Sequence, residues 1–93
     1  MLDIVKTRLR LKTASLDDDV QALIEEARMD LKLAGVTAEK ADSDTDPLVR
    51  RAVCFYCLAH FGKDNPDGDH YARCYEKLRD KLGLTGAYNG RLV

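Results

Sequence analysis

Three cysteines and two histidines are the side chains of this sequence best suited to chemistry. They fall into two groups with helical spacing: Cys54, Cys57 and His60, then His70 and Cys74. Thiolates and imidazoles at such spacing can bind zinc, and a Cys-x-x-Cys pair can support redox chemistry. The strongest metal hypothesis joins four of them across a turn, namely Cys57, His60, His70 and Cys74.

Helical geometry argues against both chemistries within the first group. Over one continuous helix, its three side chains fan over about 120° and climb about 9 Å, so they do not easily converge on a tetrahedral ion. A redox Cys-x-x-Cys pair normally lies at a helix N-terminus, whereas this pair falls in the middle of a predicted helix. We interpret the cysteines mainly as small core residues and predict neither a metal nor a cofactor.

The sequence offers no catalytic constellation beyond these residues. Neither histidine has a nucleophile or a carboxylate at a signature spacing, and no glycine-rich phosphate loop occurs. We therefore predict a protein without enzymatic activity. Fifteen basic and sixteen acidic residues give a net charge of −1, which provides no general attraction to nucleic acid.

Apolar segments are too short for a membrane. The longest run, residues 52–59, has eight residues, far fewer than a membrane-spanning helix needs. Residues 1–12 already alternate apolar and charged types, so we expect no signal peptide and a cytosolic protein where it is made. In a reducing compartment the odd number of cysteines indicates free thiols.

Helical spacing of apolar residues dominates the 93 residues, and this length fits one domain. We predict an all-α fold with a four-helix core over residues 1–82 and an extended C-terminal arm over residues 83–93. The predicted helices cover residues 2–11, 17–34, 47–61 and 69–82. The third is apolar almost all round, so we place it at the centre of the bundle.

The second predicted helix carries two apolar stripes. Its core stripe consists of Val20, Leu23, Ile24, Ala27, Leu31 and Ala34. A narrower stripe of Ala22, Met29 and Leu33 lies nearly opposite. A surface helix of a monomer needs only one apolar face, so this second stripe has two explanations. It is either ordinary exposed apolar surface or a contact with a neighbouring subunit.

Acidic residues mark two helix starts. Ser15 or Asp17 is expected to cap the second helix, and the acids at 17–19 favour its positive end. That cluster resembles a metal site, but the helix N-terminus accounts for it. Asp46 followed by Pro47 is a strong start signal for the third helix, and Gly35 is a natural stop for the second.

The stretch between the second and third helices, residues 36–46, is polar and acidic. We predict an exposed loop that presents Asp42, Asp44 and Asp46. Arg50 and Arg51 follow near the start of the third helix, where the helix dipole disfavours positive charge. They pair either with these acidic residues or with carboxylates of a partner, and the sequence leaves both explanations open.

A small helical DNA-binding or regulatory protein is the alternative function class. A helix-turn-helix domain places basic and polar residues on a recognition helix. The third helix is too apolar for that role, and the fourth mixes Glu76 and Asp80 with its basic residues.

Several strings occur together in a characteristic order. The segment MLDIVKTRLRL at 1–11 precedes SLDDDV at 15–20 and LIEEAR at 23–28, and DPLVRRAV at 46–53 precedes LAH at 58–60. This layout resembles the head–tail connector (adaptor) proteins of tailed bacteriophages and prophages, which are also labelled DNA-packaging proteins. The likeness covers about residues 1–82. The cysteines of the third helix and the glycine-containing tail depart from the family pattern.

The resemblance implies a structural virion protein that forms a homo-oligomeric ring beneath the portal protein. Such a ring extends the DNA channel, lets genomic DNA pass without sequence-specific binding, and supports a stopper or tail-completion protein. Its location would be the head–tail junction of the virion, and the host cytoplasm during assembly.

The same resemblance implies three surfaces. Ala22, Met29 and Leu33 would contact the adjacent subunit. Leu84, Tyr88, Leu92 and Val93 would dock on the portal or another neighbour. Asp42, Asp44 and Asp46 would line the channel or face the tail. The plainer alternatives are exposed residues, a frayed chain end and a solvated loop.

Overall fold

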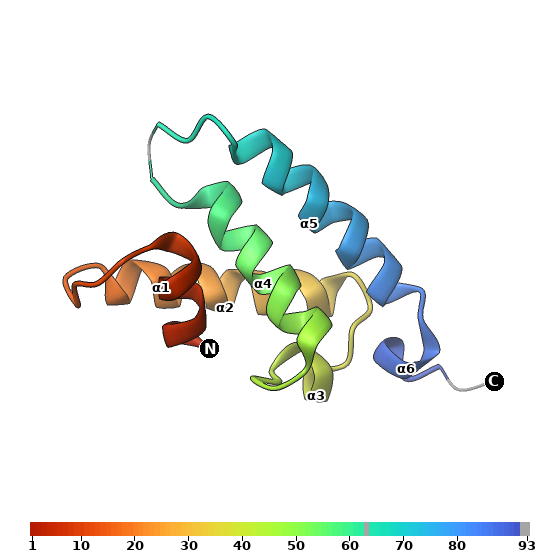
Figure 1. The fold of residues 1–93 in the computed structure, drawn as a ribbon. Coiled ribbons are helices and arrows are strands. Elements are labelled where there is room, and N and C mark those ends of the chain that lie inside the picture. Colours follow the sequence, from red (N-terminus) through yellow and green to blue (C-terminus); the bar gives the residue numbers. More distant parts are fainter. Residues whose placement is uncertain (63, 92–93) are drawn as a thin grey trace.

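The computed structural model describes residues 1–62 and 64–91, and the regular structure of these ranges is entirely helical. The helices are α1 (Leu2–Leu9), α2 (Asp17–Leu33), α3 (Ala38–Ala41), α4 (Pro47–His60), α5 (Gly68–Gly83) and α6 (Gly86–Asn89) (Figure 1). The predicted all-α class is confirmed. The predicted count of four helices was too low, because α3 and α6 are single turns within stretches expected to be irregular.

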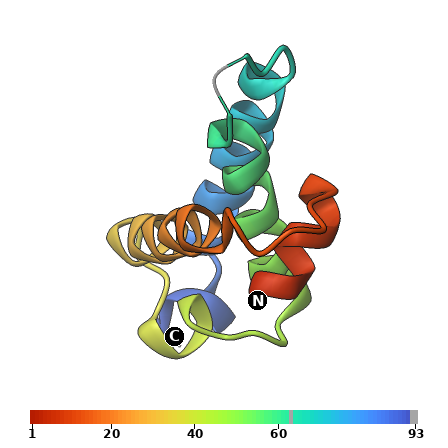
Figure 2. The same ribbon diagram turned by 90° about the vertical axis from the view of Figure 1, so that its left-hand side faces the viewer.

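Helix α4 lies at the centre of the fold. It contacts α1, α2 and α5, as its apolar composition predicts. Helices α4 and α5 form an antiparallel hairpin that projects beyond α2 (Figure 1). Helix α1 contacts both α2 and α4, and in the view along α2 it lies to the right of α4, with α2 to the left (Figure 2). The molecule is elongated, with extents of 45 × 24 × 18 Å.

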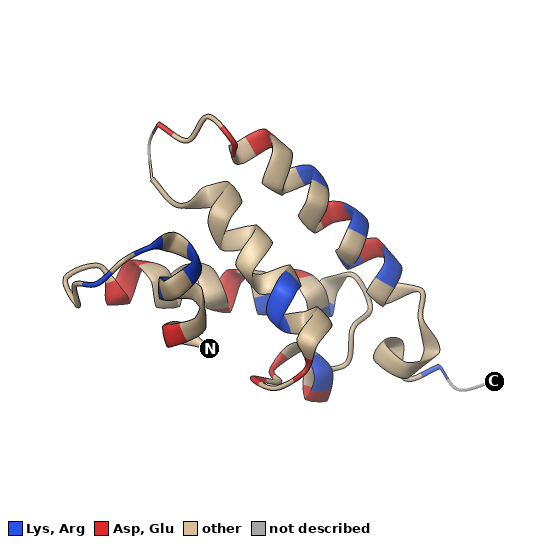
Figure 3. Cartoon of the chain, viewed as in Figure 1, with Lys and Arg blue, Asp and Glu red and all other residues tan. Residues whose placement is uncertain are grey.

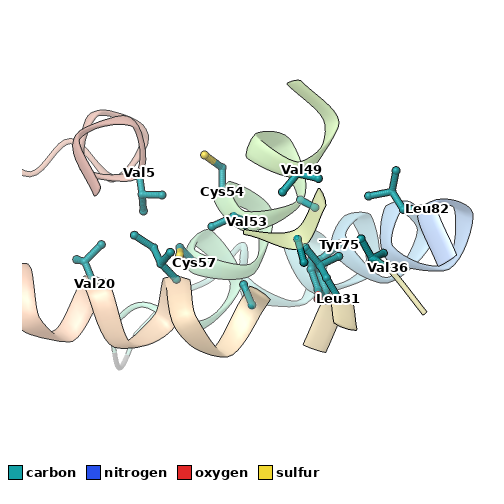
Figure 4. Packing of buried hydrophobic residues seen from close by; sticks show 14 residues of the cluster. Val5, Val20, Leu31, Val36, Val49, Val53, Cys54, Cys57, Tyr75 and Leu82 are labelled. Atoms are coloured by element: carbon teal, nitrogen blue, oxygen red, sulfur yellow. The ribbon is translucent and has the colours of Figure 1, made fainter. Parts of the chain in front are cut away.

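The core forms where α1, α2 and α5 meet α4. Val5 of α1 and Val20 of α2 face side chains of α4, including Val53 and Cys57 (Figure 4). The core stripe of α2 is confirmed for Val20, Ile24, Ala27 and Leu31, which are fully buried. Each buried Val, Leu or Ile contributes about 1.5–3 kcal/mol relative to an exposed one.

Helix α2 ends at the predicted glycine but does not begin with the predicted cap. Gly35 has φ 108°, its N–H donates to Lys32, and the N–H of Val36 donates to Leu31, each at 3.0 Å. These two bonds form a Schellman motif, which requires the left-handed backbone that glycine tolerates. At the other end the cap position is Leu16, which makes no side-chain cap bond. Ser15 bonds Thr13 instead.

Helix α4 begins as predicted. The Oδ1 atom of Asp46 accepts hydrogen bonds from the backbone N–H groups of Leu48 at 3.0 Å and Val49 at 3.1 Å. Pro47 occupies the first turn, where its missing N–H costs nothing. These bonds satisfy two of the free donors of the helix N-terminus and fix the direction in which the chain enters α4.

The stretch from Val36 to Asp46 is more ordered than predicted. It contains α3, which begins with Thr37 as a cap whose side chain accepts from the N–H of Lys40. Val36 and Ala41 are buried in the core. Our expectation of an exposed loop was wrong for the first half, because these two apolar side chains anchor the segment against the bundle.

The described part of the C-terminal arm is folded back and is not extended. It forms α6, and the carbonyl of Tyr88 accepts from the N–H of Thr37 at 2.9 Å. The Asn89 side chain donates to the carbonyl of Gly83 at 3.0 Å. Helix α6 therefore lies beside α3 (Figure 2). Leu92 and Val93 lie outside the described residues.

Candidate interaction surfaces

The cysteines and histidines do not assemble a metal site in the described part of the chain. Cys57 is fully buried, and burial raises the pKa of its thiol to about 12. Cys74 is half-buried, with its Sγ 3.7 Å from Nε2 of His70, and His60 packs against the ring of Tyr56. Within residues 1–62 and 64–91, no three His, Cys, Asp or Glu side chains lie close enough to hold an ion. The four-residue hypothesis is therefore withdrawn.

The second apolar stripe of α2 is exposed to solvent. Met29 is 55% exposed and Leu33 is 80% exposed, and Ala22 is also exposed. At 100° per residue these three lie opposite the buried stripe of α2, so they point away from α4. The structure thus places all three predicted subunit-interface residues on one accessible face.

Leu33 also lines a groove of about 500 Å³ between the C-terminal ends of α2 and α5. Leu84, which is 85% exposed, lies in the same groove. The chain approaches itself closely here, because a Cβ atom on Gly83 would clash with the carbonyl oxygen of Ala34. The structure therefore joins a predicted subunit-interface residue and a predicted docking residue in one apolar patch, which their separation in sequence did not indicate.

Asp30 and Arg79 line one side of this groove and, together with Tyr75, form a polar cluster that we call the clasp. The hydroxyl of Tyr75 donates to Oδ2 of Asp30 at 2.6 Å, and Nη1 of Arg79 lies 3.3 Å from the same oxygen. Arg79 also donates from Nε to Asp80 at 3.0 Å. Burial, and then the bond to Asp30, raise the pKa of Tyr75. The clasp holds α5 against α2 and so fixes the spacing of Leu33 and Leu84.

Tyr88, the other described docking candidate, has an internal role. Its hydroxyl donates to Oδ1 of Asp46 at 3.1 Å, and its ring lies under the ammonium group of Lys40 at 5.4 Å. The ring packs against the hydrophobic core. Tyr88 therefore attaches the arm to the start of α4, which leaves Leu84 as the exposed anchor of the described arm.

The three predicted channel-facing acids all have partners within the chain. Asp42 pairs with Lys32 at 3.0 Å. Asp44 pairs with Arg28 and, at 3.7 Å, with the amino group of Met1. The hydrogen bond from Arg28 holds the pKa of the Asp44 carboxyl below its usual value. The side chains of Asp42 and Asp44 remain about half exposed.

Asp46 does not fit the predicted exposed position. Its side chain is only 11% exposed and serves as the cap of α4. Helix capping fully explains this carboxylate, so only Asp42 and Asp44 remain as candidates for a surface that faces DNA or the tail.

A basic groove between α1 and α4 is a surface that the sequence did not reveal. It encloses about 430 Å³ and is lined by Arg8, Arg50 and Arg51 together with Ile4, Pro47 and Cys54. None of the three arginines forms an ion pair with any residue that the structure describes. Of the two explanations left open above, pairing with the nearby acids is therefore wrong. Only the packing of α1 on α4 brings Arg8 to this place.

None of the described helices is both long enough and apolar enough to cross a bilayer. The fold is a small helical domain with exposed apolar and charged faces, which is the character of an assembly protein. The chain belongs to the phage connector protein family, whose family model, "Phage connector protein", matches residues 1–89. Comparison with curated proteins and with solved structures gives no match.

Family membership confirms the resemblance to phage head–tail connectors and extends it from residue 82 to residue 89. The family is structural, so the chain has a structural role as a virion component, in contact with other virion proteins.

Proposed function

We propose that copies of this chain form a ring beneath the portal protein at the head–tail junction. The ring extends the DNA channel and supports a stopper or tail-completion protein. The observation that carries this proposal is the exposed apolar face of α2, with Met29 at 55% and Leu33 at 80% exposure. A domain of this size gains stability from burying such a face against another subunit.

The apolar patch of Leu33 and Leu84 is the proposed site of contact with the portal or another neighbour. Leu84 is almost fully exposed, and the Asp30–Arg79 pair beside it is polar surface that is about one third exposed. Interfaces commonly combine an apolar centre with a polar rim of this kind. Leu92 and Val93 continue the same arm in the sequence, and we propose that they extend this contact.

The half-exposed Asp42 and Asp44 are the proposed residues that face the channel or the tail. Their carboxylates are held by Lys32 and Arg28, so they present a fixed surface to passing DNA. Carboxylates repel phosphates, so a surface of this kind does not attract the duplex.

Co-sedimentation with portal particles of the same phage tests the docking site. We expect Leu84→Asp to weaken binding at least tenfold, because a charge in an apolar contact must be desolvated without a partner. The matched control is Leu48→Asp, which changes a leucine at 39% exposure outside the groove. Equal portal binding by the wild-type chain and Leu84→Asp would contradict the docking site, and absence of portal binding by the wild-type chain would contradict the proposed function.

A further inference from the structure

The arginine groove between α1 and α4 presents three guanidinium groups without carboxylates. Arg8 and Arg51 are exposed and Arg50 is half-buried. The groove lies at the start of α4, where the positive end of the helix dipole adds to the same field. Charge repulsion of this kind opposes folding of the free chain, and carboxylates of a partner would relieve it through strong paired hydrogen bonds.

The outer face of α2 carries the opposite charge. Asp18, Glu25 and Glu26 are exposed and lie within about 60° of the Ala22–Met29 stripe around the helix axis. None of the three forms an ion pair with a described residue. Glu26 accepts one long bond, 3.4 Å, from the hydroxyl of Tyr56.

The basic residues of α2 do not neutralise this acidic face. Arg28 and Lys32 lie beside Glu25 on the helix, but their charges are taken up by Asp44 and Asp42, with which they pair. The outer face of α2 is therefore acidic with an apolar centre.

The two surfaces match in character and lie on opposite sides of the molecule. The groove has Ile4, Pro47 and Cys54 among its arginines, so it too combines apolar surface with charge. In the view of Figure 2, α2 lies to the left of α4 and α1 to its right, and Figure 3 shows basic segments on α1 and early α4 and acidic segments on α2. Two different surfaces on opposite sides favour a head-to-tail contact, which closes into a ring when the rotation between copies permits.

We infer that the arginine groove of one copy binds the acidic outer face of α2 of the next copy. The inference rests on the proposed ring and identifies the two surfaces that form its repeated contact. Arg50 and Arg51 pair with Glu25 and Glu26, while Met29 packs against the apolar part of the groove. Because exposed charges are screened over about 10 Å at 0.1 M salt, the association weakens as salt rises.

Charge reversal on each surface separately tests the contact. A groove variant carries Arg50→Glu and Arg51→Glu, and a face variant carries Glu25→Lys and Glu26→Lys. Sedimentation velocity over a concentration series at low salt measures self-association, and circular dichroism verifies folding. We expect the wild-type chain to associate and each variant alone to remain monomeric. The matched control, Lys77→Glu with Lys81→Glu on the exposed side of α5, should associate like the wild type.

Mixing the two variants distinguishes this contact from any other. In an equimolar mixture, the unaltered face of one variant matches the unaltered groove of the other, and the reversed groove matches the reversed face. The mixture should therefore regain association, with the two variants alternating. The chain that combines all four reversals should regain self-association. A wild-type chain that stays monomeric at low salt, variants that associate like the wild type, or a mixture that stays monomeric would overturn the inference.

The groove could instead bind DNA, which is also negatively charged. The same variants distinguish DNA binding from self-association. A fluorescent duplex provides the probe, with binding measured by anisotropy. If the groove variant loses duplex binding but keeps wild-type self-association, the inference is wrong. A ring that still forms on the portal with both variants would overturn the contact and leave the proposed function intact.

Discussion

The carboxylate of Asp46 has several partners within the fold. It caps α4 through two backbone N–H groups, accepts the hydroxyl of Tyr88, and lies 3.8 Å from the ammonium group of Lys40. The sequence predicted the cap correctly from the Asp-Pro pair, because that signal is local. It did not predict the bond to Tyr88, because that contact depends on the arm folding back. The same carboxylate was therefore expected, wrongly, to face the channel.

The three thiols are expected to differ in reactivity by their burial. Burial raises the pKa of Cys54 and brings that of Cys57 to about 12, whereas Cys74 is half-buried on α5. Since the thiolate is the reactive form, we expect iodoacetamide to label Cys74 at least tenfold faster than Cys57 in the native protein. Mass spectrometry of timed samples measures this, and labelling in denaturant, where all three should react alike, is the control.

The raised pKa of Cys57 also makes the folded protein less stable at high pH. The unfolded chain releases this proton near the usual thiol pKa of about 8.5, while the folded chain keeps it until about pH 12. The neutral thiol therefore contributes fully to the free energy of unfolding below the thiol pKa of the unfolded chain. That contribution falls as pH rises from about 8.5 to about 12. Native labelling of Cys57 as fast as Cys74 at neutral pH would contradict the buried position of Cys57.

At the scale of elements, long helices were predictable and single turns were not. Helices α2 and α4 have apolar periodicity over several turns and clear start or stop residues, so their bounds were predicted within one residue. Helices α3 and α6 have four residues each, too few to show a period or to form without tertiary contacts. The burial of Ala41 and the packing of Tyr88 hold them in place, and neither contact can be inferred from local sequence.

The crossing of α2 and α5 depends on Gly83. A Cβ atom there would clash with the carbonyl oxygen of Ala34, a backbone atom that cannot move without disturbing the end of α2. Overpacking costs about 1–3 kcal/mol, and the higher helix propensity of alanine returns about 1 kcal/mol. We expect Gly83→Ala to lower the free energy of unfolding by about 1–2 kcal/mol in urea titrations followed by circular dichroism.

Lys81→Ala is the matched control for Gly83→Ala, because it changes an exposed residue of the same helix. It should leave the free energy of unfolding within about 0.5 kcal/mol of the wild-type value. A Gly83→Ala chain as stable as the wild type would show that α2 and α5 do not approach as closely as described.

At the scale of the whole molecule, the fold separates two kinds of surface. One is the apolar patch of Leu33 and Leu84, and the other is the pair of oppositely charged faces on α2 and between α1 and α4. The exposed stripe of α2 was predictable, because helical periodicity alone identifies a second face. The arginine groove was not, because Arg8 is more than forty residues from Arg50 in sequence and only the packing of α1 on α4 joins them.

Electron microscopy of portal particles mixed with the purified chain shows whether the chain assembles into a connector ring. We expect a closed ring of additional density on the tail side of the portal, coaxial with its channel. The same density should be absent from portal particles alone. Single copies bound without contact to one another, or no bound copies at a large excess of the chain, would contradict assembly into a connector ring.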